Sequence, residues 1–202
     1  MASVTPQTGP TLNAKLVVKP FVDKRREHQP AETFTARKNP VLIEGKELCI
    51  NLERGYAGSV PEELASVVER HVARRRVLAA RDANSVDYEL EGSVLVFYGL
   101  RVRSDTKTVD TTLMGVPGAV IDEHTAKARG RVVVAFSDLR LHNLQDGTSK
   151  PLQAVGVNVK GDSFNGGCNS IFKHVDSKLQ EVVETLSIQI EQAIRTWPKP
   201  SR

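Results

Sequence analysis

The stretch YELEGSVLVFYGLRVR, residues 88–103, decides the fold of this chain. Its even-numbered residues, from Tyr88 to Val102, are apolar apart from one glycine, whereas its odd-numbered residues are charged at both ends. A period of two predicts a long β-strand that lays one face on a hydrophobic core. Leu95 and Phe97 fall on the more polar side, where they need cover from the chain or from a partner.

Shorter apolar runs predict further strands around this one. They are residues 15–22, residues 41–52 with a break near Gly45, and residues 126–141 and 152–160 as a hairpin. The turn of that hairpin contains Asp146 and Gly147, and Asp-Gly between two apolar runs is typical of a tight turn. The runs therefore predict a mostly antiparallel sheet.

Two segments have the three- to four-residue spacing of amphipathic helices. The first begins where Ser59 stands three residues before Glu62, with Pro61 between them, and this spacing predicts a capped helix start. The second runs from Phe172 to Trp197, where apolar residues recur every three or four positions until a proline ends the pattern. We expect both helices to bury one stripe each.

The order of these elements predicts an α+β fold built as a two-layer sandwich. A mostly antiparallel sheet of about four or five strands carries both helices on one face, and the second is the long C-terminal helix. We expect residues 14–197 to form a single domain. Residues 1–13 have the small, polar, Pro- and Gly-bearing composition of a flexible tether, and residues 198–202 form a short tail.

The composition is that of an ordinary globular protein with a mild basic excess. The 202 residues carry a formal charge of +4, and 40% are hydrophobic, 26% charged and 5% aromatic. No segment approaches the roughly 20 apolar residues that a membrane-spanning helix needs. The charge permits contact with anionic partners, but so few aromatic residues argue against bases stacked on rings. We therefore do not expect nucleic acid to be the partner.

Cationic residues gather in a loop after the first strand and at the end of the first helix. One interpretation is a surface that meets anionic lipid or an anionic partner. The other is a solvated loop and a helix end where cations are favoured by the helix dipole. The candidates for an anionic contact are Lys24, Arg25, Arg26, Arg74 and Arg76.

The segment LMGVPGAVI, residues 113–121, is uncharged between charged flanks. A connection exposed to solvent is usually polar, so this segment either packs back on the core or contacts a partner or a membrane. It is the leading candidate for a functional surface in the sequence. The partner-contact candidates are Leu113, Met114, Val116, Pro117 and Val120.

The cysteines and histidines offer little chemistry. Cys49 and Cys168 either form a disulfide or remain two reduced thiols, and the sequence leaves both open. The five histidines form no close pair, and no Cys/His cluster has zinc spacing, so we expect no metal and no cofactor. His71 lies on the apolar face of the first helix, where we expect a hydrogen-bonded core residue.

A Gly-Asp-Ser triplet ending at Ser163 has the local sequence of one esterase family's nucleophile block. That chemistry needs a later Asp-x-x-His to supply the base, and the only later histidine is His174. The triplet also follows a hairpin instead of an early parallel strand. We therefore expect no catalytic residue and no enzyme.

The series of elements over residues 14–197 resembles small bacterial outer-membrane and periplasmic lipoproteins, the broad group with the curli-export and penicillin-binding-protein-activator lipoproteins. Two local motifs carry the resemblance. They are Pro20-Phe21-x-Asp23 after the first strand and Asp87-Tyr88-x-Leu90-x-Gly92 at the start of the long strand. The sequence departs from such proteins in having no signal segment and no lipobox, which leaves the anchor in doubt.

The resemblance implies a non-enzymatic module anchored to the outer membrane on its periplasmic side. Such a module would bind another envelope protein, part of an assembly machine or a second copy of itself, with membrane contact through a lipid anchor. The alternatives are a basic α/β nucleic-acid-binding domain and, third, a serine hydrolase that uses Ser163.

Overall fold

The structure is a computed structural model that describes residues 14–28, 41–43, 46–51, 59–74, 86–104, 128–161 and 168–197. The elements in chain order are β1 (Leu16–Val18), β2 (Val22–Asp23), α1 (Arg25–His28), β3 (Val41–Ile43), β4 (Lys46–Asn51), α2 (Val60–Arg74), β5 (Tyr88–Ser104), β6 (Ala128–Asn143), β7 (Ser149–Pro151), β8 (Val155–Gly161) and α3 (Cys168–Arg195). The strands near residues 41–52, the long strand, the hairpin and the C-terminal helix thus confirm the predicted order.

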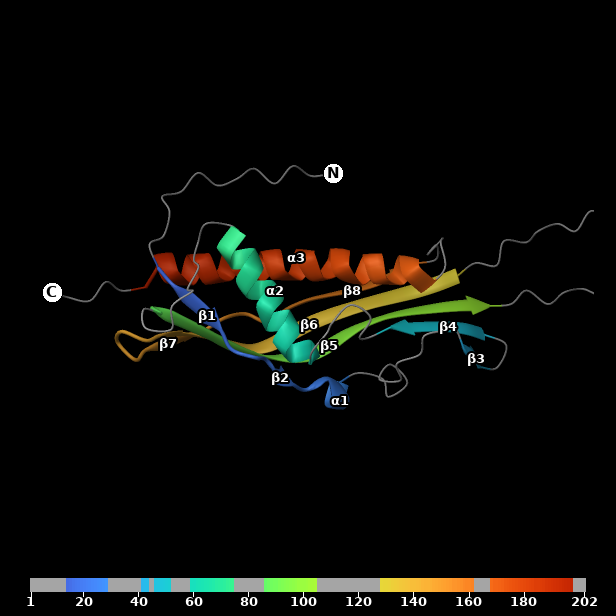
Figure 1. The fold of residues 1–202 in the computed structure, drawn as a ribbon, viewed down its shortest axis with the longest axis horizontal. Helices are drawn as coiled ribbons and strands as arrows, with labels where there is room; N and C mark the ends of the chain where they lie inside the picture. The colour runs from blue at the N-terminus through green and yellow to red at the C-terminus, as the bar shows by residue number, and fades with distance from the viewer. Residues whose placement is uncertain are drawn as a thin grey trace, which may run out of the picture.

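All the strands belong to one sheet centred on β5 (Figure 1). The strand β5 pairs antiparallel with β4 and with β6, and β6 pairs antiparallel with β7 and β8. The short strands β1 and β2 run parallel to the first half of β5. The sheet is mostly antiparallel, as predicted, but in the described part of the chain it has eight strands because short segments at both edges join it.

The helices α2 and α3 lie on one face of this sheet, so the two-layer α+β prediction is confirmed (Figure 1). The core between the layers is a single cluster of apolar side chains from both helices and from β1, β5, β6 and β8. Leu64 and Leu186, one from each helix, are fully buried in it. The stripes that the sequence predicted are therefore the stripes that face the sheet.

The pairing of β5 with β6 has two irregularities, and one of them overturns a detail of the sequence prediction. The pairing of β5 with β6 shifts register between Glu91 and Ser93 and again between Val94 and Val96. The first shift comes from an extra residue in β6 near Asp138 and leaves the alternation of β5 unchanged, whereas the second comes from an extra residue in β5 near Leu95 and moves that alternation by one position. Val94 therefore lies in the core, but beyond it the core residue is Phe97, not its even-numbered neighbours. Phe97 therefore lies on the core side and not on the more polar side where the alternation placed it, and its cover comes from the chain itself.

The even-numbered residues beyond the shifts form a second, smaller cluster away from the main core. Tyr98 and Val133 are buried there, and Val96 and Leu100 pack against them. Arg131 precedes Val132 of the main core by one position, so Arg131 lies on the same side of the sheet as this second cluster. This is the side that α2 and α3 do not cover (Figure 1).

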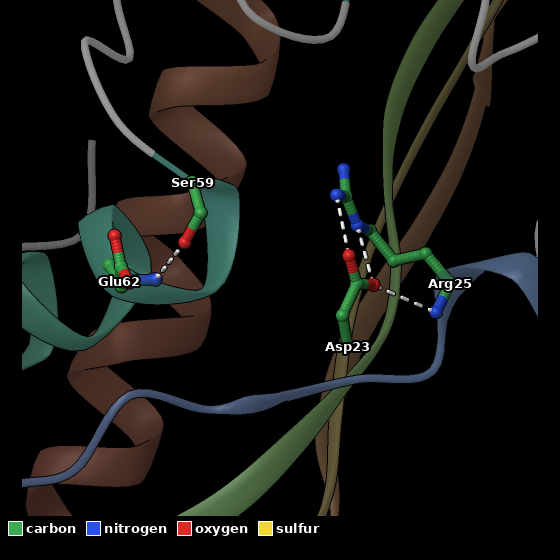
Figure 2. A network of polar contacts seen from close by, with 4 residues as sticks. All are labelled: Asp23, Arg25, Ser59 and Glu62. Atoms are coloured by element: carbon green, nitrogen blue, oxygen red, sulfur yellow. Dashed lines mark hydrogen bonds and ion pairs between the residues drawn. The ribbon is translucent and has the colours of Figure 1, made fainter.

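The first helix begins as the sequence predicted. The N–H of Glu62 donates to Oγ of Ser59 at 3.4 Å, which satisfies one free backbone donor of the first turn of α2 (Figure 2). The long helix α3 crosses β5 closely, because a Cβ at Gly99 would lie 2.6 Å from Val175 Cγ2 and 2.9 Å from Ile171 Cγ1. Glycine at position 99 is thus what lets the helix approach the sheet.

Candidate functional site

Several residues that the sequence singled out lie outside the described residues. They are Leu113, Met114, Val116, Pro117 and Val120 of the apolar segment, Arg76 of the basic group, and Ser163. Contact of the 113–121 segment with a partner stays a prediction.

Arg25 is the buried member of the basic group, with an exposed fraction of 6%. Its Nε donates to Oδ1 of Asp23 at 2.9 Å and its Nη2 donates to Oδ2 at 2.8 Å, while its backbone N–H also donates to Oδ1 (Figure 2). The hydrogen bond from Arg25 holds the pKa of Asp23 below its ordinary value, against the opposing effect of burial. The structure thus pairs this guanidinium with a carboxylate of its own chain.

Lys24 is paired in a similar way, although it is more exposed. Its Nζ lies 2.9 Å from Oδ2 of Asp138 on β6, and this bond is the largest cause of the lowered pKa of Asp138. Asp138 itself has a φ of 51°, a left-handed backbone conformation that is uncommon for a residue other than glycine. Arg26 is exposed on α1 and Arg74 closes α2, so an anionic contact by these two stays a prediction.

The choice between a disulfide and two reduced thiols also stays open, because the structure describes only the backbone of the two cysteines. Cys49 lies in β4 opposite Arg101 of β5, and Cys168 begins α3. The elements β4 and α3 contact each other.

The two motifs on which the resemblance rests, around Phe21 and around Asp87, lie next to each other in the structure. The side chain of Asp87 accepts hydrogen bonds from the N–H of Lys15 at 2.8 Å and from Nε2 of Gln145 at 2.6 Å. It thereby ties the chain before β1 to the β6–β7 turn. Gly92 has a matching role in the core, since a Cβ there would lie 2.7 Å from Leu139 Cδ2 and 3.3 Å from the ring of Phe21. These residues hold the sheet together.

The end of α3 is fixed on the same turn. Nε1 of Trp197 donates to Oγ1 of Thr148 at 3.1 Å, and the ring of Trp197 contacts Tyr88 with centroids 5.6 Å apart. Nζ of Lys150 lies 4.6 Å from the centroid of the Trp197 ring and donates to the carbonyl oxygen of Thr196 at 3.0 Å. Lys150 thus closes the C-terminus of the helix, where a cation is favoured.

The strand β8 forms an open edge of the sheet. It pairs with β6 from Val155 opposite Phe136 to Gly161 opposite Gly130. The side chain of Gln189 covers the chain just before it, by accepting a hydrogen bond from the N–H of Gln153 at 2.9 Å. Among the described residues, none forms a backbone hydrogen bond with the outer side of β8. An edge of this kind presents unpaired N–H and C=O groups to any strand that approaches.

The other edges of the sheet are shorter or interrupted. The strand β1 has three residues, β2 has two, and Pro20 lies between them. The strand β3 has three residues, whereas β8 has seven and contains no proline. Short strands and prolines are the usual protection of an edge against added strands, so β8 is the least protected of the edges that the structure describes.

Two cations stand next to each other at this edge. Arg131 of β6 and Lys160 of β8 are direct neighbours in the antiparallel register. Nε of Arg131 donates to Oδ1 of Asn158 at 3.0 Å, so the guanidinium reaches over β8. Lys160 is exposed, and among the described residues no carboxylate forms an ion pair with either cation.

Sequence reasoning found the strand near 152–160 but not its place at the edge. The signal was present in VGVNVKG, a run of alternating valines without proline. Nothing local distinguishes an edge strand from a central one in such a run, because the distinction depends on how many neighbours the strand has in the sheet.

The described residues contain no group of three or more side chains that could hold a metal ion. None of the helices in the described part of the chain is long and apolar enough to cross a membrane. His174, the only histidine after Ser163, lies exposed on α3.

Comparison with known proteins shows the fold alone. No protein-family model matches the sequence, and no curated protein matches it. Among solved structures, protein XCC0632 from Xanthomonas campestris, of the family DUF330, has 14% identity and a TM-score of 0.52 over 94% of this chain and 91% of its own. A minor lipoprotein from Acinetobacter baumannii has 14% identity and a TM-score of 0.34 over 95% of this chain and 99% of its own. The chain therefore shares its fold with the DUF330 protein.

Proposed function

We propose that this chain is a non-catalytic domain of a bacterial envelope lipoprotein, held on the periplasmic side of the outer membrane, which binds another envelope protein through the edge of β8. The observation that carries the proposal is that β8 is a seven-residue edge strand without proline. No described residue forms backbone hydrogen bonds with its outer side. Addition of a strand to such an edge is a common way in which proteins recognise extended segments of a partner.

The contacts of the polar side chains support a binding role over catalysis. Asp23, Asp87 and Asp138 are each engaged by donors of the same chain, and these bonds fix loops and strands in place. An active carboxylate or histidine is instead expected in a cleft with a second titratable group poised for proton transfer. These three carboxylates thus serve the scaffold, and among the described residues the open backbone at β8 is available to a partner.

The envelope location is supported by the sequence. Residues 2–13 have tether composition, and the two motifs at Pro20 and Asp87 resemble those of small envelope lipoproteins. A domain on a tether would hold its β8 edge within reach of proteins in the same compartment.

Photo-crosslinking in living cells tests this function. We would incorporate p-benzoylphenylalanine in place of Asn158, which is exposed on β8, and separately in place of Gln180, which is exposed on α3. Light should produce a discrete adduct in the envelope fraction with the probe at position 158 and none with the probe at position 180. Equal adducts from both positions, or none from 158, would contradict the proposal, and recovery of the protein from the cytosolic fraction would contradict the location.

A further inference from the structure

We infer that the segment which joins the sheet at β8 is an extended segment of the partner protein that carries acidic side chains on the face away from α2 and α3. This inference rests on the proposed function and gives the chemistry of the partner. It follows from the juxtaposition of Arg131 and Lys160 beside an open strand edge.

Like charges at directly opposite positions of an antiparallel pair destabilise a sheet. Arg131 and Lys160 occupy such positions in the β6–β8 ladder. Two lysines beside β1 and β2 do have carboxylate partners, since Nζ of Lys19 lies 2.6 Å from Oε1 of Glu89 and Nζ of Lys24 lies 2.9 Å from Oδ2 of Asp138. Arg131 and Lys160 have no such partner among the described residues, and a carboxylate of a binding partner could form an ion pair with them.

Asn158 gives the Arg131 side chain a defined direction. Its Oδ1 accepts from Nε, so the remaining guanidinium N–H groups are directed over β8 with Lys160 two positions along the same strand face. A carboxylate can accept two parallel hydrogen bonds from a guanidinium, which favours this anion over a diffuse negative surface.

A strand added to β8 would lie about 4.8 Å from it, with alternate side chains on the Arg131 and Lys160 face. An acidic residue opposite Asn158 or Lys160 would then stand within reach of both cations. The valines of β8 lie on the other face, where Val155 is buried and Val157 packs against the core. The recognised pattern is therefore acidic residues alternating with apolar ones.

A second copy of this chain fits the edge less well. Antiparallel pairing of β8 with itself would place two more cations, Arg131 and Lys160 of the second copy, on the same sheet face. The repulsion already present between neighbouring positions would increase. Charge complementarity thus favours an acidic partner over self-association.

Two labelled peptides test the inference. Both alternate valine with a charged residue over ten positions, one with glutamate and one with lysine, and binding to the purified chain is followed by fluorescence anisotropy. We expect tighter binding of the glutamate peptide, and protection from solvent exchange at alternate amides of β8 when it binds. Equal affinity for the two peptides, or binding that leaves the β8 amides unprotected, would overturn the inference.

Charge reversal supplies the matched control. Lys160→Glu should weaken binding of the glutamate peptide by roughly tenfold and improve binding of the lysine peptide, because an attraction becomes a repulsion. Lys173→Glu makes the same change of net charge at an exposed position of α3 and should alter neither affinity. An equal effect of both variants would show a general charge effect and overturn the inference.

Failure of the inference can be told apart from failure of the proposed function. If neither peptide binds but position 158 still crosslinks in cells, the acidic class is wrong while partner binding at β8 stands. If neither peptide binds and position 158 gives no adduct, both fail. If light scattering shows a dimer whose β8 amides are protected without peptide, a second copy occupies the edge and the inference is overturned.

Discussion

Nε2 of His71 on α2 lies 2.6 Å from Oε2 of Glu184 on α3, and this contact joins the two helices that cover the sheet. Both side chains are largely shielded from solvent, with exposed fractions of 20% and 30%. The sequence predicted a hydrogen-bonded core residue at position 71; the structure confirms the hydrogen bond and supplies the partner, but His71 lies at the margin of the core and not in it.

The His71–Glu184 contact should stabilise the domain. In a double-mutant cycle with His71→Ala and Glu184→Gln, we expect a coupling free energy of about 1 kcal/mol, because partial shielding strengthens a hydrogen bond between ionisable groups. Urea unfolding measures it. The matched control is the Lys178–Glu181 pair on α3, which is more exposed, with fractions of 30% and 57%, and for which the coupling should be smaller. Equal coupling in the two pairs would contradict the structural role of His71.

Gly99 should tolerate no larger residue beneath α3. A Cβ would meet Val175 Cγ2 at 2.6 Å, and the overpacking from Gly99→Ala should cost about 1–3 kcal/mol of unfolding free energy. The double variant Gly99→Ala, Val175→Ala removes the clashing methyl and should recover part of the loss relative to Val175→Ala alone. Thermal unfolding tests this order, and additive effects of the two changes would count against the close approach of the helix.

The Asp23–Arg25 pair should make stability depend on pH in the acid range. The pKa of Asp23 is lowered in the folded state, chiefly by its hydrogen bond from Arg25, so its contribution is present above the unfolded value of about 3.9 and is lost as pH falls through the folded value. Asp23→Asn should lower stability by about 1 kcal/mol at neutral pH, since solvent screens this partly exposed carboxylate.

Urea unfolding from pH 7 to pH 3 checks this sign. The difference between wild type and Asp23→Asn should shrink as the medium becomes acidic. Lys173→Gln also changes one charge, but at an exposed position of α3, and should leave the pH profile unaltered. A constant difference at every pH would show that the carboxylate does not titrate with a lowered pKa.

The left-handed backbone at Asp138 gives a further test. Asp138→Gly and Asp138→Ala both remove the contact with Lys24, but only glycine adopts a φ of 51° without a steric cost. The glycine variant should therefore melt at the higher temperature of the two. Equal melting temperatures would indicate that the irregular strand relaxes when the side chain is shortened.

Local patterns in the sequence predicted much of this fold. The helix stripes from Leu64 and Leu186 and the Asp146-Gly147 turn follow from interactions between residues a few positions apart, which periodicity and turn chemistry report directly. The hydrogen bond by which Ser59 caps α2 is also an interaction between residues a few positions apart. These features could be predicted because their causes lie within single segments of the chain.

The sequence by itself thus determined the order of strands and helices, the long strand and the apolar stripes. Only the tertiary structure decided that a register shift turns Phe97 into the core, that Lys24 pairs with Asp138, and that β8 lies at the edge with Arg131 beside Lys160. These outcomes depend on pairings between residues far apart in the chain, and a register shift of one position reverses the side chains that face the core. The candidate site therefore became visible only when the strands were assembled.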